Sequence, residues 1–126
     1  MMDKKNNTFH FLSRIEPILV SLGRLAEGYP ENDPHAALIR LRQFGDLLGR
    51  IVGHKFGVFI EPEEDYFYLL NKLKDIDEIP DKIINGFDEL RMKGNNALHS
   101  HQGDYQDVKN NIRTAIRLGH WLVSLD

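Results

Sequence analysis

Apolar residues recur at intervals of three and four along most of the chain, the spacing that gathers side chains on one face of a helix. From this pattern we expect a short helical lead-in at 8–14 and then five main helices. Their expected positions are about 17–27, 34–56 and 63–75, a fourth helix beginning at Pro80-Asp81, and 104–124. The pattern therefore predicts an all-α, up-and-down bundle of about five helices with short connections.

Individual residues that start or interrupt helices set several of these boundaries. Pro17 lacks a backbone N–H and interrupts the first apolar run, so the main helix should begin there. Asp33-Pro34 and Asp104 are typical helix starts, because an aspartate oxygen accepts from the free N–H groups of the first turn. The apolar run at 58–60 has no second strand-like run nearby, and we expect a loop that packs its side chains under the bundle.

Length and composition narrow the class of protein. We expect residues 1–126 to form a single domain, because 126 residues suit one core and leave no room for a large multi-part enzyme. The absence of cysteine excludes a disulfide framework and a thiolate metal site. No apolar run reaches the ~18 residues that a membrane span needs. We therefore expect a soluble, cytoplasmic protein without membrane contact.

The charge is unevenly distributed. Residues 1–60 hold eight Lys and Arg against six Asp and Glu, whereas residues 61–126 hold eight against thirteen, for a net charge of -3. Eight of the acids lie between Glu61 and Asp81. A basic footprint over the whole surface is therefore absent, and contact with nucleic acid would need a local basic patch.

Motif searches exclude most cofactor chemistry. The sequence contains no glycine-rich phosphate loop and no dinucleotide fingerprint, and its six histidines lack metal-ligand spacing. We therefore predict no metal site and no cofactor within these residues.

The segment Glu89–His99 has a distinctive pattern of polar residues. On a continuous helix Arg91, Asn95 and His99 follow at intervals of four and form one polar stripe. Gly94 inside this run costs about 1 kcal/mol relative to alanine. Either a neighbouring helix packs against its bare backbone, or the helix breaks there in a turn.

Three interpretations of this stripe stay open. In the structural one, Arg91 and Asn95 cap the ends of neighbouring helices and His99 fixes the loop to the last helix. In the binding one, cations of the stripe and of the last helix form a surface for phosphate or for an acidic partner. The residues of this surface are Arg91, Lys93, Lys109, Arg113 and Arg117.

The third interpretation is catalytic. His99 would act as a general base and Arg91 would stabilise phosphate charge during metal-independent RNA cleavage, with Asn95 between them. Eight residues of unbroken helix span about 12 Å. This chemistry therefore needs a break at Gly94 or a second copy of the chain in a homodimer.

Several stretches resemble one known family, the N-terminal domain of the restriction (R) subunit of type I restriction-modification enzymes in its K-type branch. They are the opening residues 1–6, Phe9-x-Phe11-Leu12, residues 29–34, 38–45 and 65–73, residues 90–99 and Trp121. The most distinctive element is Arg-x-x-Gly-Asn-x-Ala-x-His, here Arg91 to His99. This domain is also similar to the HEPN group, whose ribonucleases carry an Arg-x4-6-His motif, whereas seven residues separate Arg91 from His99.

The resemblance implies a module of a longer subunit that restricts DNA. In that family the full-length R subunit is an ATP-dependent DNA translocase and endonuclease, and its ATP and Mg²⁺ sites lie outside the residues matched here. The implied partners are the modification and specificity subunits, the remaining domains of the R subunit, and DNA. We expect the module itself to be non-catalytic and to mediate contacts.

Overall fold

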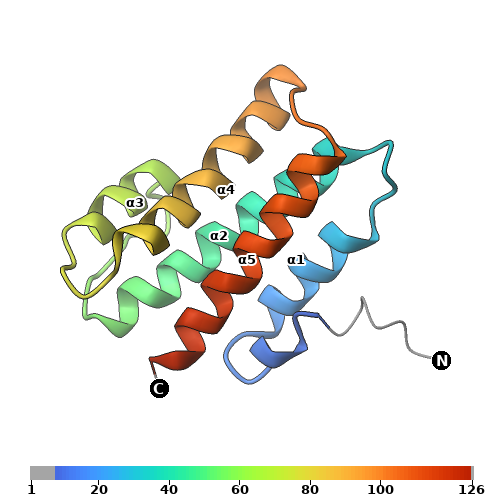
Figure 1. The fold of residues 1–126 in the computed structure, drawn as a ribbon. Helices are drawn as coiled ribbons and strands as arrows, with labels where there is room; N and C mark the ends of the chain where they lie inside the picture. The colour runs from blue at the N-terminus through green and yellow to red at the C-terminus, as the bar shows by residue number, and fades with distance from the viewer. Residues whose placement is uncertain (1–7, 126) are drawn as a thin grey trace.

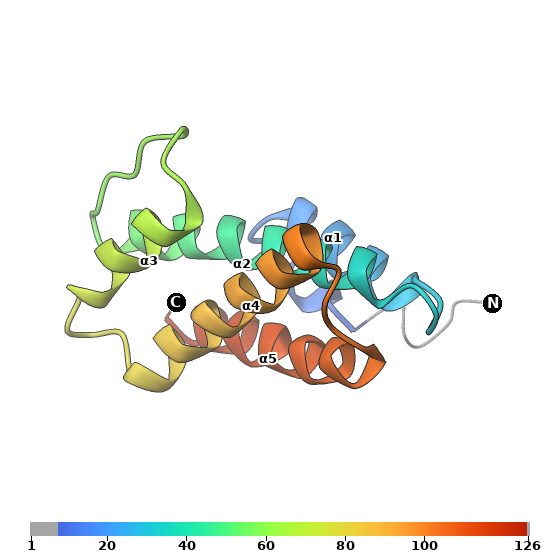
Figure 2. The same ribbon diagram turned by 90° about the horizontal axis from the view of Figure 1, so that it is seen from above.

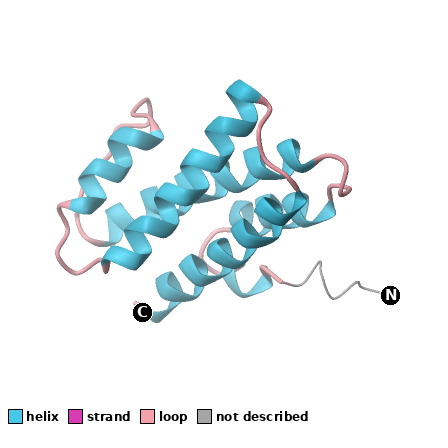
Figure 3. Ribbon diagram, turned by 45° about the horizontal axis from the view of Figure 1, so that its top comes forward, coloured by secondary structure: helices cyan, strands magenta, loops and turns pink. Residues whose placement is uncertain are grey.

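The computed structural model describes residues 8–125, so the opening residues of the family resemblance lie outside it. Figures 1 and 3 show helices joined by loops, and residues 8–125 contain no strand. The elements are the 3-10 helix η2 (His10–Leu12) and the α-helices α1 (Pro17–Gly28), α2 (Pro34–Lys55), α3 (Tyr66–Lys74), α4 (Asp81–Ser100) and α5 (Tyr105–Ser124). The predicted all-α class and five main helices are confirmed.

The helix starts predicted at Pro17, Asp33-Pro34 and Asp104 are confirmed. Pro17 occupies the first turn of α1, and the Asp33 carboxylate accepts from the Ala36 backbone N–H at 3.5 Å. At α5, Asp104 and Asp107 form a reciprocal capping box with distances of 2.9 and 3.0 Å. The predicted lead-in at 8–14 is too long, because only the three residues of η2 are helical there.

Helices α2 and α4 form the centre of the bundle and run antiparallel. Position 45 of α2 faces Leu90 of α4, and position 49 faces Phe87. Helix α5 returns antiparallel to α4, and α1 packs on both α2 and α5 (Figure 1). The core between them includes side chains without exposed surface: Phe9, Leu41, Phe44, Leu48, Phe87, Leu90 and Leu122.

Helix α3 departs from the predicted up-and-down order. Gly45 of α2 lies against Tyr66 at the start of α3, and Gly49 lies against Leu69. The two helices therefore run parallel, on the opposite side of the molecule from α1 (Figures 1 and 2). This close approach needs glycine, because a Cβ at Gly45 would overlap the Tyr66 hydroxyl.

The connection 56–65 makes the parallel arrangement possible by running back along α2. The Arg50 guanidinium donates to the Glu61 carbonyl at 3.0 Å and to the Glu64 carbonyl, and Lys72 Nζ donates to the Phe59 carbonyl at 3.0 Å. The predicted loop at 58–60 is confirmed, but its predicted packing is wrong for Phe59, which is 71% exposed. Helix α3 also begins later than predicted, at Tyr66, where the Asp65 carboxylate accepts from the Tyr68 N–H at 2.8 Å.

Within residues 8–125, none of the helices combines the length and apolar character needed to cross a membrane.

Candidate functional site

Helix α4 continues without a break through the distinctive segment, so the predicted alternative of a turn at Gly94 is wrong. Gly94 is buried against α2, and a Cβ there would overlap the Arg42 Cβ and lie 2.9 Å from the Arg42 Cγ and Cδ. The other predicted alternative is confirmed: a neighbouring helix packs on the bare backbone of Gly94.

The contact between α2 and α4 at Gly94 also involves Asn95. Arg42 Nε donates to Asn95 Oδ1 at 2.7 Å, and the Arg42 guanidinium lies 5.5 Å from the ring centroid of Tyr66. Arg42 therefore joins α2, α3 and α4. Its partner Asn95 lies 53 residues away, so this bond could not be read from local spacing.

Tyr66 also contributes to the contact between α2, α3 and α4. Its hydroxyl is buried and donates to the Phe87 carbonyl at 2.7 Å. Burial raises the pKa of the Tyr66 phenol above its ordinary value, so the group stays neutral and remains a donor.

Arg91 faces α3 and not α5. Its guanidinium donates to Asp88 at 2.8 and 3.1 Å and lies 5.2 Å from the ring centroid of Phe67. The predicted capping role is wrong for both Arg91 and Asn95, because each bonds side chains within the bundle and neither reaches a helix end.

His99 is exposed in the last turn of α4. It makes no hydrogen bond, ion pair or ring contact to any other residue of 8–125, so the predicted anchoring of the loop is absent. Because α4 is unbroken, about 12 Å of helix separates Arg91 from His99. Within one copy the arrangement does not bring the two groups to one phosphate, and the catalytic hypothesis now depends on a second copy.

Lys93 turns toward α5, where its Nζ lies 3.0 Å from Asp107 Oδ1. The hydrogen bond from the Asp104 backbone N–H, together with the charge of Lys93, holds the pKa of the Asp107 carboxyl below its ordinary value. Lys93 is therefore engaged in fixing the start of α5 to α4.

Three cations remain together on one exposed face of α5: Lys109, Arg113 and Arg117, which we call the α5 basic row. Arg113 and Arg117 line one cavity of about 450 Å³ together with Glu89, Asn110 and Thr114. Thr114 Oγ1 donates to Glu89 Oε2 at 2.5 Å and accepts from Arg117 at 3.2 Å. The structure therefore keeps three members of the predicted five-residue surface together and separates Arg91 from them.

A second cavity, of about 360 Å³, lies between α1 and α5 on the other side of Arg113. Lys109 lies at this cavity, and its Nζ is 5.1 Å from the ring centroid of Tyr105. Sequence reasoning missed this cavity, because the residues that line it are separated by 76 or more positions across the α1–α5 contact. We name it the α1–α5 groove; its lining is Ala26, Glu27, Tyr29, Tyr105, Val108, Lys109, Ile112 and Arg113.

Metal-ligating side chains do not gather in the described part of the chain. Residues 8–125 contain no group of three or more His, Asp or Glu side chains placed to hold an ion. The one histidine pair with a ring contact there is His35 and His101, whose centroids are 5.9 Å apart.

Comparison with known proteins identifies one informative similarity. The chain is 32% identical over 125 residues to the type I restriction enzyme EcoKI endonuclease subunit of Escherichia coli strain K12. The alignment covers 99% of this chain and 10% of the relative, so the chain spans about a tenth of that subunit. No protein-family model and no solved structure matches the chain. The resemblance to a type I restriction subunit is therefore supported along nearly the whole chain, whereas the similarity to the HEPN group stays a prediction.

Proposed function

We propose that this chain is an accessory helical module of a type I restriction enzyme R subunit, and that it contributes contacts and no catalysis of its own. The observation that carries the proposal is the 32% identity to an endonuclease subunit over 99% of the chain. The identity spans α1 to α5 and not a single motif, which supports a shared module over a chance motif match.

The chemistry of the described residues also supports a contact role. The arginine and an asparagine of the distinctive segment contact neighbouring helices: Arg91 lies over the Phe67 ring of α3, and Asn95 accepts from Arg42 of α2. Binding of ATP and Mg²⁺, which the family requires, would fall to other parts of the subunit, as the resemblance to that family implies. The module would therefore contribute to the enzyme by binding a partner.

The α5 basic row is the surface that we assign to this association. Lys109, Arg113 and Arg117 are exposed, whereas Arg91 and Lys93 already pair with carboxylates of the bundle. Exposed cations gain binding energy from an anionic partner without first breaking a strong internal ion pair. The acidic partner would be a subunit of the restriction complex, or DNA.

The test is binding of the chain to the purified complex of modification and specificity subunits. We expect saturable binding that weakens with salt and falls by about tenfold or more in the double variant Arg113→Glu/Arg117→Glu. Lys74→Glu, an exposed charge reversal on α3, is the matched control and should bind like the wild type. Unchanged binding of the double variant at low salt would remove the α5 basic row from the proposal.

A genetic observation tests the assignment itself. The reading frame of the intact gene should encode, in the same polypeptide, a nuclease domain and two motor domains. A gene that encodes this helical module beside unrelated catalytic domains would overturn the proposed membership of an R subunit.

A further inference from the structure

A cavity between the start of α4 and the end of α5 is lined by both apolar and basic side chains. It has a volume of about 290 Å³, and we call it the Trp121 pocket; its lining is Lys82, Ile83, Arg117, Leu118 and Trp121. Ile83 and Leu118 are buried, whereas Lys82 and Arg117 are exposed. The pocket therefore offers apolar surface from buried residues and positive charge from exposed ones, a combination that favours an apolar group attached to an anion.

The ring of Trp121 is held in place by α2. It stacks on Phe56, the residue that follows the last turn of α2, with ring centroids 6.5 Å apart and an interplanar angle of 18°. Because Trp121 is only half-buried and lines the pocket, part of its surface stays available to a ligand. A side chain that is already fixed contributes apolar contact with little further loss of conformational entropy on binding.

The start of α4 adds to the attraction for an anion. Lys82 and Ile83 lie in the first turn of α4, and Pro80, the residue before it, supplies no capping hydrogen bond from its side chain. The N–H groups of a first helical turn carry the positive end of the helix dipole, which favours a negative group. Asp81 in the same turn is exposed and does not line the pocket, where both charged residues are cations.

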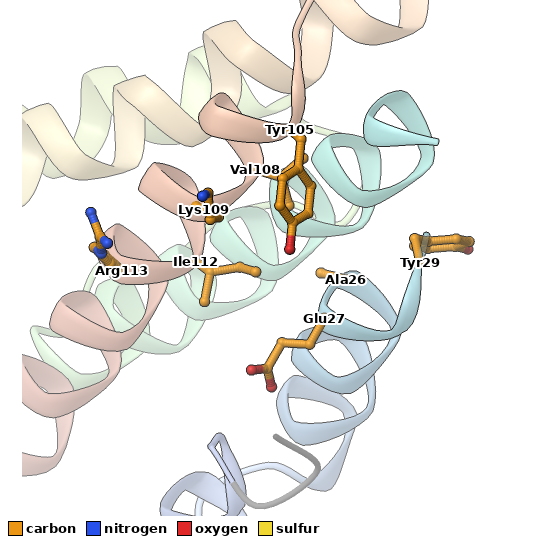
Figure 4. Close-up of a pocket in the computed structure, with 8 residues that line it drawn as sticks. All are labelled: Ala26, Glu27, Tyr29, Tyr105, Val108, Lys109, Ile112 and Arg113. Carbon is orange, nitrogen blue, oxygen red and sulfur yellow. The ribbon is translucent and has the colours of Figure 1, made fainter. Parts of the chain in front are cut away.

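Arg117 joins the Trp121 pocket to the α5 basic row. It also lines the cavity of about 450 Å³ that contains Arg113, so the two cavities are neighbours across one guanidinium. Thr114 Oγ1 accepts from Arg117 at 3.2 Å, a bond that orients the guanidinium and uses one of its five N–H donors. The Glu89 carboxylate in the second cavity already accepts from Thr114 Oγ1 at 2.5 Å. Figure 4 shows the Arg113 side chain pointing away from Glu27 of α1, which agrees with its place beside Glu89 of α4.

From this arrangement we propose that the Trp121 pocket and the adjoining arginines bind an acidic segment of a protein partner that carries one large apolar anchor residue. The anchor side chain occupies the Trp121 pocket, and carboxylates beside it pair with Lys82, Arg117 and Arg113. The inference rests on the proposed contact function and deepens it, because it chooses protein over DNA as the ligand and names the chemistry of the bound segment.

Two observations favour protein over DNA. Affinity for DNA grows with the number of phosphates that are neutralised, whereas residues 61–126, which include this surface, hold thirteen acids against eight basic residues. The buried apolar surface of Ile83 and Leu118 is of no use to a phosphate backbone, but it accepts an apolar anchor. A segment with a few carboxylates and one anchor therefore matches the site better than a nucleic acid strand.

The experiment uses Trp121, the one tryptophan of the chain, as a reporter of the pocket. The probe is a synthetic peptide of about 12 residues in which para-bromophenylalanine stands between glutamates. Bromine quenches tryptophan fluorescence by contact, so quenching reports that the anchor reaches Trp121 and not merely that the peptide binds the cations. One control peptide has glutamine in place of glutamate, and another has alanine in place of the anchor. Fluorescein-labelled forms of the peptides, and a labelled DNA single strand of about 20 nucleotides, give affinities by fluorescence anisotropy.

We expect saturable quenching of Trp121 by the brominated acidic peptide, and an affinity that is lower by about tenfold or more for each control peptide. Lys82→Glu should weaken binding of the acidic peptide by about fivefold or more, because it reverses an exposed charge at the pocket. Lys74→Glu, an exposed charge reversal on α3, is the matched control and should bind like the wild type. Circular dichroism of the full 126-residue chain confirms the fold of each variant.

Several results would overturn the proposal. Binding of the brominated peptide without quenching would show that the anchor does not reach Trp121. Equal affinity of the anchored and alanine peptides would remove the anchor, and tighter binding of DNA than of the acidic peptide would assign the surface to nucleic acid. If no peptide binds while the chain still binds the modification and specificity subunits, the pocket proposal fails and the proposed function stands. If the anchored peptide quenches Trp121 while those subunits do not bind, the proposed function fails and the pocket proposal stands.

Discussion

Replacing Gly94 with alanine tests whether the distinctive segment of α4 serves the packing of the bundle. The new Cβ would overlap the Arg42 Cβ, which is attached directly to the backbone of α2 and cannot swing aside as a side-chain end could. The substitution therefore forces α2 and α4 apart or displaces the Arg42 side chain, and either change stretches the 2.7 Å hydrogen bond from Arg42 to Asn95.

The expected change in the free energy of unfolding combines three contributions. Alanine gains about 1 kcal/mol over glycine within a helix. Overpacking a close contact costs about 1 to 3 kcal/mol. Loss of the half-buried hydrogen bond costs about 1 kcal/mol more. We therefore expect Gly94→Ala to lower the free energy of unfolding by about 1 to 3 kcal/mol.

Urea unfolding followed by Trp121 fluorescence and by circular dichroism measures this change. The control is Gly28→Ala, because a Cβ at Gly28 meets no atom within 4 Å and the residue ends α1. Gly28→Ala should leave the free energy of unfolding unchanged or slightly raised. Equal stability of Gly94→Ala and Gly28→Ala would show that the contact with Arg42 does not require glycine at position 94.

Three further predictions concern single side chains. Tyr66→Phe removes the buried donor to the Phe87 carbonyl and should cost about 1 kcal/mol in urea unfolding, and equal stability of the two proteins would contradict the role of that bond. The pKa of Asp107 is lowered in the folded chain, so its stabilising effect is present above the ordinary carboxyl pKa and is lost as the pH falls through the folded value. Asp107→Asn should therefore reduce the loss of stability below about pH 4, and an unchanged pH profile of thermal unfolding would count against this. His99→Ala should leave any metal-independent RNA cleavage by the purified chain unchanged, because His99 lies two turns from Arg91; cleavage that disappears in this variant would favour the ribonuclease hypothesis.

The features predictable from sequence are those that depend on neighbours within a few residues. Pro17, Asp33 and Asp104 begin their helices because each acts on the first turn that follows it. The apolar spacing likewise identifies Leu41 and Phe87 as core residues, and both are fully buried. These signals sufficed for the all-α class and for the number of main helices.

The direction of α3 could not be predicted in this way. It depends on the connection 56–65, which Arg50 and Lys72 hold along the bundle through backbone carbonyls. Side chains that bond loop carbonyls leave no periodic trace in a sequence. An antiparallel order was therefore expected by default, and it is wrong for this helix.

The candidate site was predictable only in part. The spacing of Lys109, Arg113 and Arg117 identifies one exposed row, because i, i+4 neighbours on a helix share a face. The same spacing could not indicate that Arg91 and Lys93, two residues apart on α4, turn to different neighbouring helices. Tertiary packing decides which charged groups of a helix stay available to a partner.

The contact function is tested most directly by the affinity of the wild-type chain and of Arg113→Glu/Arg117→Glu for the purified complex of modification and specificity subunits. Surface plasmon resonance at about 50 and about 300 mM salt would measure it, since screening weakens contacts between exposed charges. We predict saturable binding of the wild type that weakens with salt, and a loss of about tenfold or more in the double variant. Absence of binding by the wild-type chain at the lower salt concentration would contradict the proposed contact function.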